Sequence, residues 1–513
     1  MLSGIESTRV PCPPSGHGAR RVLSSRLLWL LAALPATSTG CGQTCQGVGC
    51  ASEFGASFVG IHITDRLDPS RERNPRRQDA AIVGEREHGI DWSVTVFNKR
   101  VVVGMPGPGA VRAYQVEAGV RQPATDDVGG WESDLTGDGL GDSVVPAGDL
   151  DGDGLTDLLI TAPTRTIGDL GREAGAVFIV SEGFFDDSGV LTDHPDLRRI
   201  TGPQTGAHLG DSVAVCPDLD GDGLPELLVS MPWYDLLRAD GRTVRTPLAG
   251  GVTLLHSADL PGQGSGVSAG VEGALLWTGA TVGARAGTSI ACADLIGDDT
   301  ADIIIGAPFT DGDHEAEGAV YIIDGTSTLE GDLSLVADRT FRGPLDNAWL
   351  GWDITTGDLD GDGQNELIAG VPGYARLAGA NQDRPEGQVW VWDGQDLRDG
   401  VHESPRFRIT GRTDGESLGR TVSVQDADGD DSPDMLLGAP RLEYDGAFDA
   451  GALYIFRGRP GHDGLRPQLT VRDADIVWRA SRQYLETGGT LGVGDADGDG
   501  VGDLLLIHRR QPG

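Results

Sequence analysis

The chain has 513 residues and a formal net charge of −38 at pH 7, from 78 acidic and 40 basic side chains. A protein this acidic repels nucleic acid phosphates and anionic membrane surfaces, so neither is an expected partner. Much of the negative charge lies in one short motif that recurs along the chain, and the motif is more informative than the total.

Residues 1–41 are predicted to include an export signal. Arg20, Arg21 and Arg26 precede the apolar run 27–34, and small residues lead from there to Cys41. The apolar run is too short to span a membrane as a permanent helix. Thr39-Gly40-Cys41 resembles the end of a bacterial lipobox, which implies a lipid anchor on Cys41; secretion without lipid is the alternative. Residues 1–19 match neither signal.

A tether is expected over residues 42–52. Cys45 and Cys50 either pair there after export or stay in a flexible linker. Gly42 follows the candidate lipidation site, and by analogy with bacterial lipoproteins it favours sorting to the outer membrane or cell surface. An alternative to a leader that begins at Met1 is translation from Val22, in which case residues 1–19 are not translated.

The first repeat along the chain has no acidic loop. Residues 92–96 and 101–106 read as two short strands, and Asn98, Lys99 and Arg100 lie between them. The two basic side chains would repel a cation, so no metal is expected in this repeat.

An acidic nonapeptide, D-x-D-x-D-G-x-x-[D/E], then occurs six times at intervals of 64 to 76 residues. We name the copies loops 1 to 6. In loop 3, Ile296 replaces the second aspartate, and in loop 5, Asp431 replaces the glycine. The candidate ligands are Asp149, Asp151, Asp153 and Asp157 (loop 1); Asp218, Asp220, Asp222 and Glu226 (loop 2); Asp294, Asp298 and Asp302 (loop 3); Asp358, Asp360, Asp362 and Glu366 (loop 4); Asp426, Asp428, Asp430 and Asp434 (loop 5); and Asp495, Asp497, Asp499 and Asp503 (loop 6).

This spacing predicts four to six Ca²⁺ sites. Carboxylates at positions 1, 3, 5 and 9 of a tight loop converge on one point, and Ca²⁺ prefers several oxygen ligands in a flexible loop. Plain Asp-Gly turns are the alternative for any single copy. An EF-hand is excluded because its twelfth position needs a bidentate glutamate, and this chain has apolar residues there, such as Ile160 and Val229.

Short strands surround every loop. An apolar run such as 158–160 follows it, and a Leu-Gly string such as 140–141 precedes it. A Pro turn, as at 161–163, then leads to a third strand such as 175–179, and a fourth ends near 199–202. Four strands with Gly-rich turns make one blade of a β-propeller.

Three motifs recurring in this order resemble the FG-GAP repeats of integrin alpha-chain propellers. The resemblance covers about residues 53–509 and implies an all-β, seven-bladed propeller, with a short tail at 510–513. The last repeat has only two strands, so we expect segments 55–61 and 81–84 to complete the last blade and close the ring.

Two further cysteines, Cys216 and Cys292, each lie two residues before an acidic loop on equivalent strands of neighbouring repeats. A disulfide is one interpretation. Small buried thiols are the preferred one, because free cysteine packs well in apolar cores.

The resemblance implies a calcium-stabilised extracellular binding module, acting in adhesion or as a scaffold for a protein or glycan, and a monomer. A lectin is an alternative, with Trp233 and Tyr234 as candidate sugar-stacking residues; packing between blades is the other interpretation of such aromatics. A hydrolase or lyase is less favoured, because the ten histidines, His256 among them, show no shared repeat position and no nucleophile motif occurs.

Overall fold

The computed structural model describes residues 57–64, 80–86, 92–115, 127–168, 171–194, 196–238, 243–270, 274–375, 385–398, 404–412, 415–427, 430, 432–444, 446–458, 468–479, 486–494 and 503–509. These residues belong to one compact unit, Phe54–Gly513. The expected leader, its lipidation site Cys41, the tether and the tail lie outside the described residues. None of the helices within the described ranges has the length and apolar character of a membrane-spanning segment.

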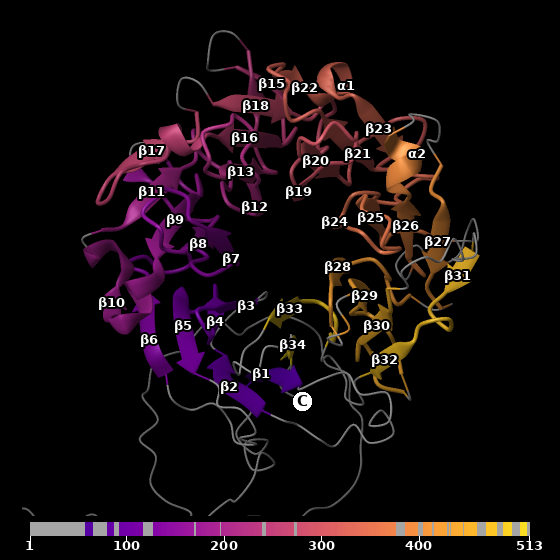
Figure 1. Ribbon diagram of the computed structural model, residues 1–513, viewed down its shortest axis with the longest axis horizontal. Helices are drawn as coiled ribbons and strands as arrows, with labels where there is room; N and C mark the ends of the chain where they lie inside the picture. Colours follow the sequence, from indigo (N-terminus) through magenta and orange to yellow (C-terminus); the bar gives the residue numbers. More distant parts are fainter. Residues whose placement is uncertain are drawn as a thin grey trace, which may run out of the picture. The chain divides into compact units, whose positions relative to one another are not determined.

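Six antiparallel sheets form the blades of a β-propeller, with their innermost strands turned towards a common centre (Figure 1). From the innermost strand outwards, the blades are β3 (Ser93–Phe97), β4 (Arg100–Met105), β5 (Ala110–Gln115) and β6 (Asp127–Glu132); β7 (Val144–Gly148), β8 (Asp157–Ala162), β9 (Ala176–Ser181) and β11 (Arg198–Thr201); β12 (Val213–Cys216), β13 (Glu226–Met231), β16 (Gly251–Leu255) and β18 (Leu275–Thr278); β19 (Ser289–Ala293), β20 (Asp302–Ala307), β21 (Ala319–Ile323) and β23 (Arg339–Arg342); β24 (Ile354–Gly357), β25 (Glu366–Val371), β26 (Gln388–Trp392) and β27 (Phe407–Thr410); and β28 (Thr421–Gln425), β29 (Asp434–Ala439), β30 (Ala452–Phe456) and β32 (Ile476–Arg479).

Four blades gain a fifth, parallel strand on their outer edge, supplied by the next repeat along the chain. These strands are β10 (Ser188–Val190) on β6, β17 (Gly266–Ser268) on β11, β22 (Gly331–Asp332) on β18 and β31 (Gln468–Thr470) on β27. The added strand covers a sheet edge that would otherwise expose unpaired backbone groups, and it ties neighbouring blades together. A small hairpin, β14 (Leu236–Leu237) with β15 (Val244–Thr246), and two short helices, α1 (Leu333–Val336) and α2 (Gly394–Arg398), lie in the connections.

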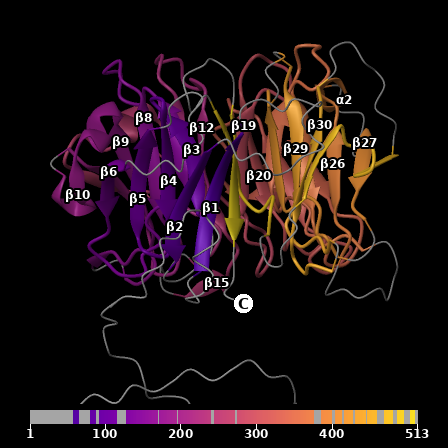
Figure 2. The ribbon, with the colours of Figure 1, turned by 90° about the horizontal axis from the view of Figure 1, so that it is seen from below.

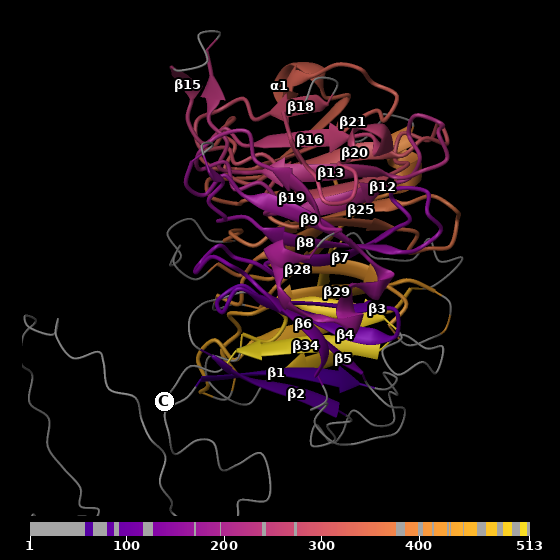
Figure 3. The ribbon, with the colours of Figure 1, turned by 90° about the vertical axis from the view of Figure 1, so that its left-hand side faces the viewer.

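A further four-stranded sheet combines the two ends of the compact unit. Its order is β2–β1–β34–β33, from β1 (Ser57–Thr64), β2 (Ala80–Arg86), β33 (Leu491–Gly494) and β34 (Asp503–Arg509). β1 pairs antiparallel with β34, with Ile61 opposite Ile507. Figure 3 labels β1, from the start of the unit, beside β34 from its end, and Figure 2 shows a yellow strand from the end of the unit next to β1.

The core lies between the faces of successive blades. In each of blades two to six the second strand is buried along its whole length, as in Asp157–Ala162, because sheets cover it on both sides. One apolar cluster joins Val102 and Val111 of the first blade to Leu158 and Phe178 of the second. This two-sided burial explains why these strands are continuous apolar runs and do not alternate with polar residues.

In five repeats the residue before the glycine of the Leu-Gly string, or its Ala or Thr counterpart, meets the glycine that precedes the third strand of the repeat before it. Gly175 forms a parallel bridge with Leu209, and four equivalent bridges follow along the chain. Gly175 has φ +88°, and a Cβ there would collide with the backbone of Leu209. Only glycine satisfies both requirements, so the repeated glycine is a contact between blades.

Candidate metal sites in the acidic loops

Each described acidic loop joins the first and second strands of its blade, as the sequence predicts: β7–β8, β12–β13, β19–β20, β24–β25 and β28–β29. The ninth loop residue is the first residue of the second strand and is almost fully buried in all five loops. The five loops therefore begin on the inner strand and return to the core at a buried carboxylate.

This ninth carboxylate holds the loop backbone. One of its oxygens accepts a hydrogen bond from the backbone N–H of the second loop residue, a role that the sequence analysis did not predict. The pairs and N···O distances are Asp157 with Leu150, 3.0 Å; Glu226 with Leu219, 2.8 Å; Asp302 with Leu295, 2.7 Å; Glu366 with Leu359, 2.7 Å; and Asp434 with Ala427, 3.2 Å.

The first carboxylate organises the turn. Asp149 accepts hydrogen bonds from the N–H groups of Gly152 at 2.7 Å and Gly154 at 2.8 Å, and loops 2 and 4 repeat both contacts. Gly154 has φ +83°, which explains the glycine at position 6. Loop 3 keeps this conformation without glycine, because Asp299 occupies the position at φ +69° and donates its N–H to Asp294.

Three loops bring predicted ligands together. Their carboxylate oxygens lie within 4.8 Å of one another in the groups Asp149, Asp151 and Asp157; Asp218, Asp220, Asp222 and Glu226; and Asp358, Asp360 and Glu366. Asp153 and Asp362 lie outside these groups, and each accepts a backbone N–H two residues further on. In the described part of the chain, Asp294, Asp298 and Asp302 form no such group.

Loops 5 and 6 are described only in part. Asp426, Asp430 and Asp434 are placed, with Asp430 donating its N–H to Asp426. Asp428, Asp495, Asp497 and Asp499 lie outside the described residues, as does the side chain of Asp503. The predictions for these ligands stay predictions.

Basic side chains that the sequence analysis missed face three of the loops. In loop 1, Arg198 of β11 lies 2.8 Å from Asp151 and 2.6 Å from Asp157. In loop 4, Arg406 lies 3.6 Å from Asp360 and also pairs with Asp393. These arginines come from around the start of the fourth strand, about 40 residues from the loop, so the loop motif itself contains no signal for them.

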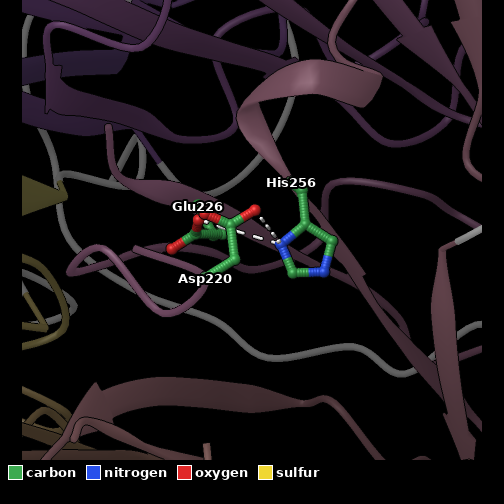
Figure 4. Close-up of side chains that lie close together, drawn as sticks. All are labelled: Asp220, Glu226 and His256. Carbon is green, nitrogen blue, oxygen red and sulfur yellow. Dashed lines mark ion pairs between the residues drawn. The ribbon is translucent and has the colours of Figure 1, made fainter. Parts of the chain in front are cut away.

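The third such side chain is His256, directly after β16. Its Nδ1 lies 3.4 Å from Asp220 and 3.8 Å from Glu226 (Figure 4). β13 and β16 pair Leu227 with Leu255, so His256 lies opposite the ninth loop residue, a position that no histidine occupies in the other described loops. The same registers place Ser181, Asp324, Asp393 and Arg457 opposite the ninth residues of the other described loops.

Among the residues that the structure describes, two buried carboxylate oxygens have no hydrogen-bond partner. They are Oε1 of Glu226 and Oδ1 of Asp302, both on side chains with 0% exposure. Burial raises the pKa of Glu226, and it raises the pKa of Asp302 to about 6 and that of Glu366 to about 7. Buried, partly uncompensated carboxylates of this kind are a chemically suitable environment for a divalent cation.

Cys216 and Cys292 form a disulfide, so the preferred interpretation as small buried thiols is wrong. The two residues are on β12 and β19, the innermost strands of adjacent blades, with Cα atoms 5.3 Å apart. A cavity of about 630 Å³ adjoins the disulfide and is lined by residues of loops 2 and 3, among them Asp218, Asp220 and Asp294.

Trp233 and Tyr234 lie away from this cavity. The Trp233 ring is half-buried, stacks on His208 with centroids 5.2 Å apart, and has the Arg285 guanidinium 4.0 Å from its centroid. Tyr234 packs against the apolar cluster between the second and third blades. These contacts agree with the packing interpretation of the two aromatics.

Comparisons with known proteins agree with this architecture. A family model for the FG-GAP repeat matches residues 140–180 and 350–392. Integrin alpha-5 of Xenopus laevis is 28% identical over 237 residues, which is 44% of this chain and 21% of that protein.

Two other relatives match shorter stretches. Phosphatidylinositol-glycan-specific phospholipase D of Mus musculus is 32% identical over 177 residues, 32% of this chain and 19% of that protein. Integrin alpha-PS2 of Drosophila melanogaster is 30% identical over 166 residues, 31% of this chain and 10% of that protein. The matched region is thus a small part of each relative. The repeat motifs, the radial sheets and these matches together identify the chain as an FG-GAP β-propeller protein.

Proposed function

We propose that the chain is a calcium-stabilised, extracellular binding module that acts in adhesion or as an interaction scaffold for a protein or glycan. The observation that carries the calcium part is the convergence of carboxylate oxygens within 4.8 Å in loops 1, 2 and 4. Oxygen-only donor sets that include several carboxylates favour Ca²⁺.

The role of calcium in this proposal is structural. Without a cation, loop 2 holds four carboxylates close together, and Glu226 is fully buried with one oxygen unpartnered. A bound cation would relieve that repulsion and supply the missing partner. Because calcium would bind the folded loops and not the unfolded chain, each site held at 100 times its dissociation constant would add about 2.7 kcal/mol of stability.

The binding role rests on similarity. The relatives include integrin alpha chains, and a propeller presents rigid loops on two faces. Fold alone does not determine function, so the partner class is a proposal by analogy. We propose an extracellular protein or glycan as partner, a monomeric state, and export followed by lipidation at Cys41 or secretion.

We also propose that the β2–β1–β34–β33 sheet is a seventh blade that closes the ring. Supporting this, β1 pairs with β34 over six residue pairs, from Val59–Arg509 to Thr64–Leu504. The inner strand of this sheet, β33, contacts β3 of the first blade and β28 of the sixth. Removal of residues 53–84 would then expose the edge of β34 and abolish cooperative unfolding; a deletion variant that melts cooperatively at the wild-type temperature would contradict the closure.

The partner proposal is tested by a binding screen. The purified chain is applied to glycan and extracellular-protein arrays, once in Ca²⁺ and once in EDTA. The Ca²⁺ concentration is on the order of 1 mM or above, because extracellular sites have dissociation constants of about 10⁻⁴–10⁻³ M. A calcium-dependent hit supports the binding role and identifies its ligand class. A folded protein that binds nothing on either array in calcium would contradict it.

A lectin is the second candidate, favoured by half-buried aromatics next to arginines. Besides Trp233 and Arg285, Arg420 lies 3.9 Å from the Trp352 ring centroid. If sugars stack there, Trp233→Ala abolishes sugar binding and leaves the fold intact, whereas unchanged sugar binding in this variant excludes Trp233 as a sugar site.

A hydrolase is the least favoured proposal. Its support is the partial similarity to a phospholipase D, and a turnover assay on phosphodiester substrates tests it.

A further inference from the structure

We propose that loop 2 binds a first-row transition-metal ion of the Zn²⁺ class, through Asp220, Glu226 and His256. This goes beyond the calcium proposal, which assigns oxygen ligands only. The three side chains come from different places: Asp220 from the loop, Glu226 from the first residue of β13, and His256 from the residue after β16 (Figure 4).

The distances fit a central ion better than direct hydrogen bonds. Nδ1 of His256 is 3.4 Å from Oδ2 of Asp220 and 3.8 Å from Oε1 of Glu226. Metal–ligand bonds of about 2.0–2.2 Å in a tetrahedral site place the ligand atoms roughly 3.4 Å apart. The two oxygens also lie within 4.8 Å of each other, so all three atoms can contact one ion placed between them.

The atoms that would bind the ion lack partners of their own. Oε1 of Glu226 and Nδ1 of His256 are both buried and make no hydrogen bond. Glu226 has 0% exposure, and its other oxygen is held by the Leu219 N–H at 2.8 Å, so Oε1 is fixed in position facing the imidazole. Buried polar atoms without partners are costly, and a metal ion would satisfy both of these at once.

The remaining carboxylates of loop 2 have other contacts. Asp218 accepts the N–H groups of Gly221 and Gly223 at 2.7 and 2.9 Å. Asp222 accepts the Ser257 hydroxyl at 2.5 Å and the Leu224 N–H at 2.8 Å. Asp220 accepts the Asp222 N–H at 3.1 Å through Oδ1, and its Oδ2 and Oε1 of Glu226 are the oxygens that face His256.

The imidazole makes loop 2 different from the other described loops. At the same strand position these have Ser181, Asp324, Asp393 and Arg457, none of which offers a neutral nitrogen ligand. Imidazole suits Zn²⁺, Cu²⁺ and Ni²⁺, whereas Ca²⁺ prefers oxygen. One residue thus changes the metal preference of an otherwise repeated loop.

The test is a Zn²⁺ titration by calorimetry on the full chain, first without Ca²⁺ and then in excess Ca²⁺, which competes for Asp220 and Glu226. It compares the wild type with His256→Ala, His256→Asp and His314→Ala. His314 is the matched control, because it lies 3.3 Å from a single carboxylate, Asp346. We expect the wild type and His314→Ala to bind Zn²⁺ equally, and His256→Ala to bind it at least about 100-fold more weakly, beyond the loss typical of outer-shell changes. His256→Asp copies the loop 4 arrangement and should lose Zn²⁺ preference while keeping calcium.

Co²⁺ supplies a direct readout of the ligands, since its visible absorption reports coordination geometry. We expect a tetrahedral-type band in the wild type and none in His256→Ala. All variants keep the same cysteines, so the difference between them isolates His256. Wild-type protein that binds no Zn²⁺ even without competing calcium, or His256→Ala with unchanged affinity, would overturn the inference. Because the calcium count is measured separately on each variant, failure of the zinc site and failure of the calcium proposal are distinguishable.

Discussion

The buried ninth carboxylate gives a sharp test of how the loops are held, and Asp302 of loop 3 is the best position for it. One Asp302 oxygen accepts two backbone N–H groups, from Leu295 at 2.7 Å and Ile296 at 2.8 Å. Asp302→Ala removes this acceptor and leaves the two donors unsatisfied. Hydrogen bonds to a charged group contribute about 1.5–3 kcal/mol each. We use the lower value, because burial already raises the pKa of Asp302 to about 6, and expect a loss of about 3 kcal/mol.

The assay is urea unfolding in EDTA at pH 7, followed by tryptophan fluorescence. Asp302→Asn is the matched control: its amide oxygen can still accept the two N–H groups, and the buried charge is gone. We expect the asparagine variant to unfold within about 1 kcal/mol of the wild type. An alanine variant as stable as the asparagine variant would refute the view that this carboxylate holds the loop backbone.

Three further predictions concern the disulfide, pH and a buried ion pair. Replacing Cys216 and Cys292 with serine opens a loop of 76 residues, which should cost about 4 kcal/mol in chemical unfolding; equal stability of oxidised wild type and variant would contradict this. Burial raises the pKa of Asp157 to about 6 and of Glu366 to about 7, so the folded chain binds more protons than the unfolded chain between about pH 4 and 7. In EDTA, stability should therefore fall as pH rises from 5 to 8, and a rising melting temperature over that range would be the wrong sign. Arg198→Gln leaves two carboxylates without their counter-charge and should cost about 3–5 kcal/mol in EDTA but less in calcium; equal losses in both conditions would argue against a cation in loop 1.

The strand order of a repeat could be predicted from sequence because its signals are local. An apolar run after a loop, a Pro turn and a glycine before the third strand each lie within a few residues of the element that they specify. Gly175 illustrates this: the recurring glycine marks the strand start, and the structure adds the contact with Leu209 that requires it. The converging aspartates of loops 1, 2 and 4 follow from spacing in the same way.

The basic neighbours of the loops could not be predicted in this way. Arg198 and His256 reach the loops from the fourth and third strands, so their positions depend on strand register, which the loop motif does not contain. The disulfide has a similar explanation. The repeat pattern predicts Cys216 and Cys292 on equivalent strands. Whether their Cα atoms come within bonding range depends on how closely the inner strands of adjacent blades approach.

The measurement that tests the central claim most directly is thermal unfolding of the full chain in Ca²⁺ and in excess EDTA. At 100 times the dissociation constant, three occupied loops would add about 8 kcal/mol if each contributes about 2.7 kcal/mol. The account predicts a large fall of the melting temperature in EDTA, reversed in a saturable way by added Ca²⁺. The same melting temperature in calcium and in excess EDTA would contradict structural calcium in this propeller.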